Sequence, residues 1–265
     1  MFILTITTDN SAAETAFARL TAYAHQGWTE QEEDNGSLRL GVHFSDETEA
    51  RMCAIEFPGS EIIPVEERNW AGEWQAQWEP ILVGQRFFLA PSWTEAETPA
   101  GRIRLEMRPG LVFGGGDHPT TQLCLELLES ATRPGVRMAD IGCGTAILAQ
   151  AALALGARAV TGCDIDPSAV DAAIESRVPV FEGSVDAIAA NSIDLLAANL
   201  PTGVLMTLMP EFLRVLAPGG CAILSGYLAE QREMLFAEAR AHGFHVESER
   251  ERDDWAACRI ARESR

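Results

Sequence analysis

Residues 138–146 (MADIGCGTA) constrain this chain more than any other part of its sequence. They combine a short apolar run, typical of a buried strand, with a turn that contains Gly142 and Gly144 and with the start of a helix. Asp164 follows 22 residues after Gly142, at the end of a second apolar run. In a parallel α/β sheet, such glycines let the backbone approach a ligand, and the acid accepts hydrogen bonds from ribose hydroxyls. The pattern therefore predicts a nucleoside-binding site.

The spacing of the glycines indicates which nucleoside is bound. A dinucleotide site has the pattern G-x-G-x-x-G, whereas Ile147 stands here where the third glycine would be. Asp140 precedes Gly142 by two residues, and its charge would repel a pyrophosphate. A cationic ligand without phosphate fits better, and S-adenosylmethionine, a sulfonium with an amino-acid tail, is such a ligand. This reasoning disfavours an NAD enzyme.

The charge of the chain limits its partners. The net charge is −19 and the sequence pI is about 4.6, so direct binding to nucleic acid is not expected, because phosphate contacts need clustered basic side chains. A basic protein or a small cationic substrate would be attracted, although acidity can also serve solubility alone. All 20 basic residues are arginine, which fits a compositional bias or, alternatively, an enzyme that modifies lysine and avoids modifying itself.

Cysteine usage and hydropathy point to a protein of the cytoplasm. The six cysteines form no C-x-x-C pair and no cluster with histidine, so we expect neither a metal site nor a disulfide framework. The first residues read as a strand rather than as a signal peptide. No apolar run reaches about 18 residues, so we expect no membrane span.

Residues 1–66 read as a small α+β domain of the ferredoxin-like kind. Apolar alternation and helical periodicity predict the order strand, helix, strand, helix, strand. The expected segments are 2–7, 11–25, 37–44, 46–56 and 62–65.

Residues 67–110 read as a connector. Trp70, Trp74 and Trp78 recur at every fourth position and predict a helix with an aromatic core stripe. Two strand-like runs follow at 86–90 and 102–107.

From residue 111 to 265, strands and helices alternate. This order predicts a doubly wound, mostly parallel seven-stranded sheet, closed by an antiparallel pair at 244–250 and 255–262. The parallel strands are expected at 136–141, 159–164, 178–182, 193–199 and 221–225.

A ligand of such a sheet lies over the carboxyl ends of its strands. Four of these ends carry distinctive residues: 140–144 with the glycine turn, Asp164, the segment 183–186, which would border adenine, and Asn199. The simpler interpretation of Asp164 and Asn199 is helix capping. For Asp164 we favour ribose binding because of the matched glycine loop, whereas for Asn199 alone both interpretations stand.

A second glycine-rich loop, residues 113–121 (FGGGDHPTT), precedes a helix that begins at Pro119. Three consecutive glycines are costly in a mere linker. The helix start would suit an anionic group such as the methionine carboxylate of the cofactor, and a flexible hinge is the alternative.

Several motifs together resemble one known family, the ribosomal protein L11 methyltransferases of the PrmA type. The resemblance covers about residues 70–262, and the N-terminal unit suits the substrate-binding domain of that family. The motifs are the loop 113–121, the run 140–144, Asp164-Ile-Asp-Pro167, 224–231 (LSGYLAEQ), the tryptophans of the connector, 90–93, 108–114 and Asp254-Trp255.

This resemblance implies methyl transfer from S-adenosylmethionine to amino groups of a large-subunit ribosomal protein. By match to the motifs, Thr121, Gly142, Asp164 and Asn199 contact the cofactor, and Asn199 also faces the incoming amine. Asp140 and Gly144 belong to the same binding loop. His118 is a second catalytic candidate beside Asn199, because His118 or Asp117 would assist deprotonation of the amine. The simpler alternative is that His118 only makes hydrogen bonds within its loop.

The chain departs from the family pattern at several points. Ala146 stands where the family usually has glycine, Pro201 and Thr202 stand where it has leucine and alanine, and the stretch between Asp164 and Asn199 is short. Three alternative functions therefore stay open: a methyltransferase for another protein, one for a small amine, or a non-catalytic S-adenosylmethionine-binding protein. Methylation of planar nitrogens is disfavoured because no aromatic residue follows Asn199 in the loop.

Overall fold

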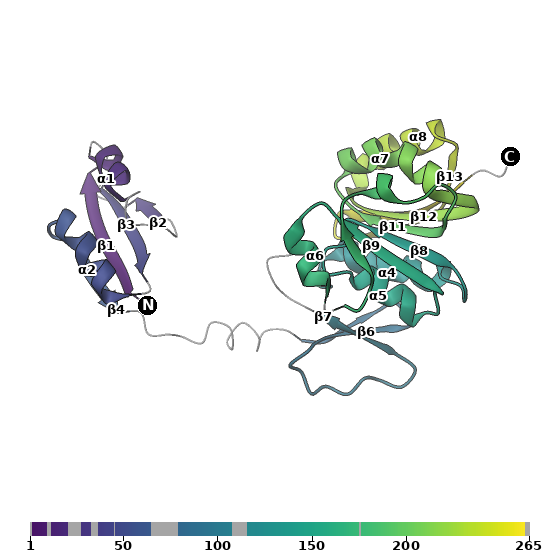
Figure 1. Ribbon diagram of the computed structural model, residues 1–265, viewed down its shortest axis with the longest axis horizontal. Helices are drawn as coiled ribbons and strands as arrows, with labels where there is room; N and C mark the ends of the chain where they lie inside the picture. Colours follow the sequence, from purple (N-terminus) through teal and green to yellow (C-terminus); the bar gives the residue numbers. More distant parts are fainter. Residues whose placement is uncertain are drawn as a thin grey trace. The chain divides into compact units, whose positions relative to one another are not determined.

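The computed structural model describes residues 2–9, 12–20, 28–32, 37–44, 46–64, 79–107, 116–174 and 176–262. The chain divides into two compact units, Met1–Gln77 and Trp78–Arg265 (Figure 1). The tryptophan stripe of residues 70–78 and the glycines at 114 and 115 lie outside the described residues. Within the described ranges, no helix is long and apolar enough to cross a membrane.

The first unit has the ferredoxin-like β-α-β-β-α-β order. Its sheet has the strand order β2-β3-β1-β4, and each neighbouring pair is antiparallel. The elements are β1 (Phe2–Asp9), α1 (Ala13–Leu20), β2 (Trp28–Glu32), β3 (Ser37–Phe44), α2 (Glu47–Glu56) and β4 (Glu61–Pro64).

Strand β2 was not predicted from the sequence. Its sequence, WTEQE, is polar after Trp28 and shows no apolar alternation. It lies at the edge of the sheet, where a strand pairs on one side only and charged residues discourage pairing with another chain. The core of this unit instead comes from the alternating faces of β1 and β3, including Leu4, Leu40 and Val42, which are fully buried.

The second unit is built on a seven-stranded sheet of order β10-β9-β8-β11-β12-β14-β13. All neighbouring pairs from β10 to β12 are parallel, and β14 and β13 are antiparallel additions. The expected doubly wound sheet with its antiparallel end is thereby confirmed. Its strands are β8 (Arg137–Ile141), β9 (Ala159–Asp164), β10 (Val180–Glu182), β11 (Ile193–Asn199), β12 (Leu216–Leu228), β13 (Phe244–Arg252) and β14 (Trp255–Arg262).

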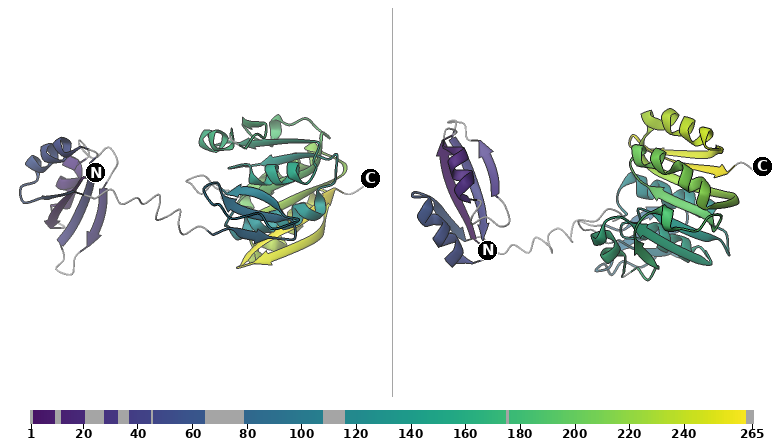
Figure 2. Two further views of the ribbon diagram at one scale, coloured as in Figure 1. Left: turned by 90° about the horizontal axis from the view of Figure 1, so that it is seen from below. Right: turned by 45° about the horizontal axis from the view of Figure 1, so that its top comes forward.

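Helices cover both faces of this sheet (Figures 1 and 2). Buried residues of α4, α5 and α6 belong to one core cluster, and those of α7 and α8 belong to the other. The helices are α4 (Pro119–Ala131), α5 (Ile147–Ala154), α6 (Pro167–Ile174), α7 (Thr202–Val215) and α8 (Arg232–Ala241), with short 3-10 turns η1 (Val185–Ala187) and η2 (Ala229–Gln231). The strand order reverses between β8 and β11, and this switch point is where α/β sheets bind ligands.

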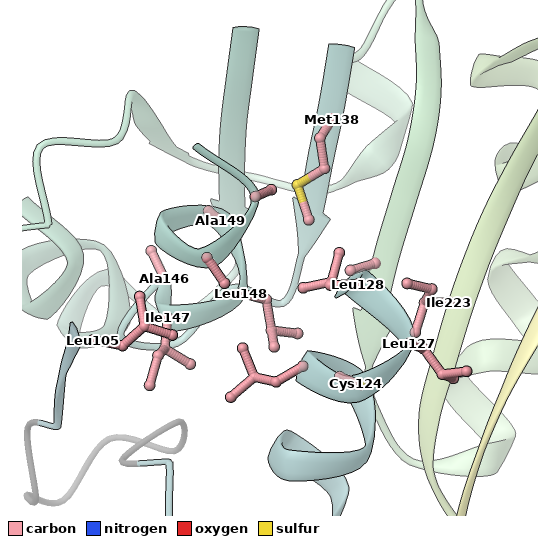
Figure 3. Packing of buried hydrophobic residues seen from close by; sticks show 14 of the residues in the cluster. Leu105, Cys124, Leu127, Leu128, Met138, Ala146, Ile147, Leu148, Ala149 and Ile223 are labelled. Atoms are coloured by element: carbon pink, nitrogen blue, oxygen red, sulfur yellow. The ribbon is translucent and has the colours of Figure 1, made fainter. Parts of the chain in front are cut away.

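A small three-stranded sheet packs against the α4 and α5 side of the second unit. Its strands are β5 (Ile81–Val83), β6 (Phe87–Pro91) and β7 (Ile103–Met107). Figure 3 shows Leu105 of β7 beside Ala146 and Ile147, in the same cluster as Cys124 and Leu128 of α4. The three-residue strand β5 was not expected from the sequence, because three residues are too few to show alternation.

A bidentate ion pair joins the amino-terminal end of β8 to β11. Arg137 donates from Nε and from a terminal nitrogen to the carboxylate of Asp194, at 2.9 and 2.7 Å, and its backbone N–H donates to the same carboxylate at 2.9 Å. The Arg137 guanidinium lowers the pKa of Asp194. This pair fixes the two strands at the end opposite to the switch-point loops.

Candidate active site

A cavity of about 730 Å³ opens at the carboxyl ends of the parallel strands. This volume lies in the usual range for sites that enclose a small molecule. The lining residues come from the ends of β8, β9, β10 and β11 and the loops after them, from α4, α6 and α7, and from β12 and β14. They are His118, Thr120, Ile141, Gly142, Gly144, Asp164, Ile165, Asp166, Ala169, Gly183, Ser184, Asn199, Leu200, Pro201, Val204, Leu208, Gly226 and Trp255.

The loop after β8 turns tightly because two of its glycines have left-handed backbone angles. The φ angles of Gly142 and Gly144 are 68° and 51°. The N–H of Gly142 donates to the carbonyl of Cys163 at 2.8 Å, which holds the loop against β9. A methyl group at Gly142 would lie 2.4 Å from a terminal carbon of Leu200, so only glycine fits there without a shift of Leu200.

Asp164 lies at the end of β9, half-buried in the cavity wall. One carboxylate oxygen accepts the N–H of Gly144 at 3.0 Å, and the other accepts the N–H of Asp166 at 3.1 Å. Helix α6 is capped by Asp166, whose carboxylate accepts the N–H of Ser168 at 2.8 Å. Capping therefore does not account for Asp164, and each of its oxygens keeps acceptor capacity for a ligand.

Asp140 lies behind the glycine loop and is not among the residues that line the cavity. Its side chain is 1% exposed, and it accepts the N–H of Ala149 in α5 at 3.1 Å. Burial raises the pKa of Asp140 to about 8, so the carboxyl group is mostly neutral at pH 7. Asp140 thus lies behind the loop, outside the cavity wall, and burial disfavours the charge from which the sequence predicted repulsion of a pyrophosphate. The glycine spacing still disfavours a dinucleotide.

Asn199, the last residue of β11, is held by α4. Its amide nitrogen donates to the hydroxyl of Thr120 at 3.1 Å and lies 3.4 Å from the hydroxyl of Thr121. Thr121 is buried and reaches the cavity only through this contact. Helix α7 has Pro201 at its N-cap, so Asn199 is no cap either. The carbonyl oxygen of Asn199 is buried and has no hydrogen-bond partner among the described residues.

An orphaned buried acceptor in a cavity wall is informative. Leaving such a group without a partner costs roughly 1–3 kcal/mol, so native structures rarely keep one without a functional reason. The donor that would satisfy the oxygen of Asn199 is absent from the described protein and is expected from a ligand.

His118 is the N-cap of α4. Its Nδ1 lies 2.7 Å from the hydroxyl of Thr120 and accepts the N–H of Thr120 at 3.3 Å, and its ring meets Trp255 edge-on with centroids 5.1 Å apart. The next two N–H groups, of Thr121 and Gln122, donate to the carbonyl of His118. The first N–H groups of α4 are thus already bonded, so the expected carboxylate site at this helix start is not supported.

The thiols beside the glycine loop are not nucleophiles. Cys143 and Cys163 are buried, and burial raises the pKa of Cys163 to about 12 and raises that of Cys143 as well. Both thiols are therefore protonated at neutral pH and act as small apolar groups. In the described part of the chain, no group of three or more potential ligands is arranged to hold a metal ion.

Ala146 occupies a position that favours glycine. It is the N-cap of α5, with φ 59° and ψ 29°, and its side chain is fully buried. A left-handed alanine costs roughly 1–2 kcal/mol. The methyl group belongs to the core cluster with Leu105 and Ile147 (Figure 3) and is not part of the cavity wall.

One arginine fixes the turn that borders the cavity after β10. Arg214 of α7 donates to the carbonyls of Ile188, Val185 and Asp186 at 2.8, 3.1 and 3.2 Å. The carbonyls of Val185 and Asp186 belong to η1, directly after the cavity residue Ser184, and that of Ile188 directly follows η1. In the stretch between α6 and β11, a side chain from α7 thus supports the cavity wall.

Several lining residues were not singled out from the sequence. Thr120 joins His118 to Asn199, and Ile165, Val204 and Leu208 supply apolar wall. No sequence pattern marks these residues, because they are ordinary helix and loop residues that line the cavity only once the chain has folded. Asp254-Trp255 was noticed only as part of the family resemblance, and Trp255 lies against His118.

The sheet order, the two helical layers and the cavity over the glycine loop define a class I methyltransferase fold. The family model described as Ribosomal protein L11 methyltransferase (PrmA) matches residues 2–263. The chain therefore belongs to the ribosomal protein L11 methyltransferase family, whose members use S-adenosylmethionine.

Individual relatives agree with this assignment. A ribosomal protein L11 methyltransferase of Synechococcus sp. (strain RCC307) is 41% identical over 209 residues, which are 74% of this chain and 69% of the relative. One from Hahella chejuensis is 36% identical over 80% of this chain and 76% of the relative. The crystal structure of a ribosomal protein L11 methylase from Lactobacillus delbrueckii subsp. bulgaricus superposes with a TM-score of 0.66 at 27% identity, over 70% of this chain and 100% of that one.

Proposed function

We propose that this protein transfers methyl groups from S-adenosylmethionine to amino groups of ribosomal protein L11. The observation that carries the proposal is the buried, unpartnered carbonyl oxygen of Asn199 in the wall of a nucleoside-type cavity that also holds Asp164. The relatives are named for methylation of that protein.

The residues of the cavity fit S-adenosylmethionine. Asp164 keeps acceptor capacity for ribose hydroxyls at the end of β9, and Gly142 and Gly144 line the cavity without side chains. Gly183 and Ser184 would border the adenine. No arginine lines the cavity among the described residues, which suits a ligand without phosphate.

The protein's part in the reaction is mainly positioning. The cofactor supplies a methyl group that is already activated by the sulfonium, so the barrier falls when the amine is held in line with it. The carbonyl oxygen of Asn199 accepts one N–H of the acceptor amine and fixes the direction of its lone pair. Thr120 and Thr121 hold Asn199 in that orientation.

An ammonium group has no lone pair and must lose a proton before transfer. The Thr120 hydroxyl accepts from Asn199 and can donate its proton to Nδ1 of His118, which places the His118 proton on Nε2. In this state, His118 orients Thr120, and water takes the proton of the amine. A rate that falls in His118→Ala at the pH values where an imidazole is neutral and the amine is still protonated would instead identify His118 as the base, whereas an unchanged rate across pH removes it from the mechanism.

We propose residues 1–66 as the substrate-recognition domain, residues 67–110 as the connector and residues 111–265 as the cofactor-binding domain. Residues 1–66 contain 12 acidic and 3 basic side chains, an imbalance that attracts a basic protein. Helix α2 presents exposed Met52 and Ile55 among its glutamates. We also place the protein in the cytoplasm, because its cysteines are free thiols.

The proposal is tested by incubating the protein with S-adenosylmethionine and purified ribosomal protein L11, followed by mass spectrometry of digested L11. We expect methyl groups on amino groups of L11, and none when these groups are blocked beforehand by acetylation. Because this chain contains no lysine, every methylated lysine in the digest comes from the substrate. Cofactor binding without transfer to L11 would contradict the proposal and favour a non-catalytic protein or another acceptor.

A further inference from the structure

The motif at residues 224–231 (LSGYLAEQ) contains only one residue of the cavity wall, Gly226. The structure places this motif at the end of β12 and in η2, directly behind the loop Asn199–Leu200–Pro201–Thr202. We call this loop the acceptor loop, because it begins with Asn199. Three separate contacts join the motif to the acceptor loop.

The first two contacts are made by the backbone. The N–H of Leu200 donates to the carbonyl of Ser225 at 2.9 Å. Gly226 has φ 90°, and a methyl group there would lie 2.4 Å from the carbonyl oxygen of Leu200 and 2.8 Å from its carbonyl carbon. The two chain segments therefore lie so close together that any side chain at residue 226 would displace the acceptor loop.

The third contact is made by Gln231. Its side-chain oxygen accepts two hydrogen bonds, from the hydroxyl of Thr202 at 2.7 Å and from the N–H of Leu228 at 2.9 Å. Thr202 is 7% exposed, so this bond is shielded from water. The side chain of Pro201, the N-cap of α7, cannot accept a hydrogen bond from the helix. Thr202, the first residue of α7, is instead bonded to Gln231 of η2.

We propose that Gln231 is a positioning residue of the methyl-transfer reaction. It holds Thr202, the last residue of the acceptor loop, while α4 holds Asn199, the first. With both ends fixed, the carbonyl oxygen of Asn199 keeps one direction, and Pro201 keeps its place in the cavity wall. This inference rests on the proposed function of Asn199 as the group that orients the amine.

The contact predicts an effect on catalysis that is separate from cofactor binding. Neither Thr202 nor Gln231 lines the cavity, and Asp164 and the glycine loop lie on other strands. Loss of the bond between Thr202 and Gln231 therefore lowers the rate of transfer and leaves the affinity for S-adenosylmethionine nearly unchanged. A merely structural role would lower thermal stability and both functional quantities together.

The experiment compares Thr202→Val and Gln231→Leu, which remove the bond, with Thr202→Ser and Gln231→Glu, which keep a hydroxyl and an acceptor oxygen. We expect kcat for L11 methylation to fall about tenfold in the first two variants, with the Kd of S-adenosylmethionine within twofold, and to stay within twofold in the second two. The double variant Thr202→Val, Gln231→Leu should be no slower than either single variant. Unchanged kcat, or kcat and affinity falling together, would overturn the proposal.

A second readout does not depend on turnover. Amide hydrogen exchange reports the bond of Leu200 to Ser225 and that of Leu205 to Pro201. We expect both amides to exchange at least tenfold faster in Thr202→Val than in Thr202→Ser, with no change for amides of β8. Equal exchange in the two variants would overturn the proposal. If the wild-type protein methylates nothing, the proposed function fails, and this exchange measurement alone decides whether Gln231 holds the loop.

Discussion

The hydroxyl of Thr120 lies 3.1 Å from the amide nitrogen of Asn199, although 79 residues separate them in sequence. This bond joins the start of α4 to the end of β11 across the mouth of the cavity. It takes the donor side of the Asn199 amide and leaves the acceptor side, which is buried, without a partner among the described residues. An amide arranged in this way is prepared to receive an N–H group from a bound molecule.

Replacement of Asp164 tests the cofactor site. Asp164→Ala removes the acceptor proposed for the ribose hydroxyls and also releases the N–H of Gly144. Hydrogen bonds to a charged group contribute about 1.5–3 kcal/mol, so the Kd of S-adenosylmethionine should rise about 10- to 100-fold by calorimetric titration. Asp171→Asn, an equal loss of charge on the exposed side of α6, serves as the control. Equal affinity in Asp164→Ala and the wild type would refute the ribose assignment.

Removal of the Arg214 guanidinium tests the cavity wall after β10. Arg214→Met keeps the apolar stem but leaves two carbonyls of η1 and that of Ile188 without their donor. We expect the turn beside Ser184 to loosen and the Kd of S-adenosylmethionine to rise about tenfold, which corresponds to about 1.4 kcal/mol. Arg240→Met, the same change at an exposed position of α8, should leave the Kd unchanged. If the two variants bind alike, Arg214 has no part in shaping the site.

The buried carboxyl group of Asp140 makes stability depend on pH. Its pKa is raised from 3.8 to about 8, so the folded state holds a proton that the unfolded chain releases above pH 4. The contribution of Asp140 to the free energy of unfolding is therefore fully present below about pH 4 and is lost as pH rises toward 8. Asp140→Asn keeps an oxygen for the N–H of Ala149 and removes this titration.

Urea unfolding at pH 5 and pH 8 measures this effect. The free energy of unfolding of Asp140→Asn, relative to the wild type, should increase by about 3 to 4 kcal/mol between the two values. A constant difference between the two proteins would show that Asp140 is ionised in the folded state. The variant should bind S-adenosylmethionine, because Asp140 does not line the cavity.

Ala146→Gly separates backbone strain from cofactor binding. The change removes the strain of a left-handed alanine, which stabilises the fold by roughly 1–2 kcal/mol. It also removes a buried methyl group and gives the unfolded chain more conformational entropy, and these two effects together destabilise the fold by about the same amount. We therefore expect a change below about 1 kcal/mol in the free energy of unfolding and a Kd of S-adenosylmethionine within about twofold. A tenfold gain in affinity would mean that the alanine disturbs the site.

Most strands and helices of the second unit could be predicted to within a few residues because each buried strand is bounded by polar residues or by glycine or proline. Strand β12 is the exception: it begins at Leu216 rather than at Cys221, because residues 216–220, expected as a helix end and a turn, continue the strand beside β11. Pro119 and Pro167 begin α4 and α6, and Asp164 and Asn199 end β9 and β11, as their sequence contexts indicated. The edge strand β2 was missed because it is polar, and β5 was missed because it is short.

The contacts within the site could not be predicted in the same way. The sequence identified Asn199 but not Thr120, since a hydrogen bond between two helix and strand ends depends on how the elements pack. The burial of Asp140 behind the glycine loop, which raises the pKa of its carboxyl group, could not be predicted for a similar reason, because it depends on how the loop packs against α5. The Thr202–Gln231 bond likewise appears only once β12 and α7 are placed side by side.

The central claim is that Asn199 acts on the acceptor amine, and Asn199→Ala tests it most directly. The measurement is the single-turnover rate of L11 methylation at saturating S-adenosylmethionine, together with the Kd of the cofactor by calorimetry. We predict a rate that is lower by about 10- to 100-fold, because the variant loses one or two oriented hydrogen bonds. The Kd of the cofactor should stay within about threefold of the wild-type value. An unchanged rate, or a loss explained entirely by weaker cofactor binding, would contradict the account.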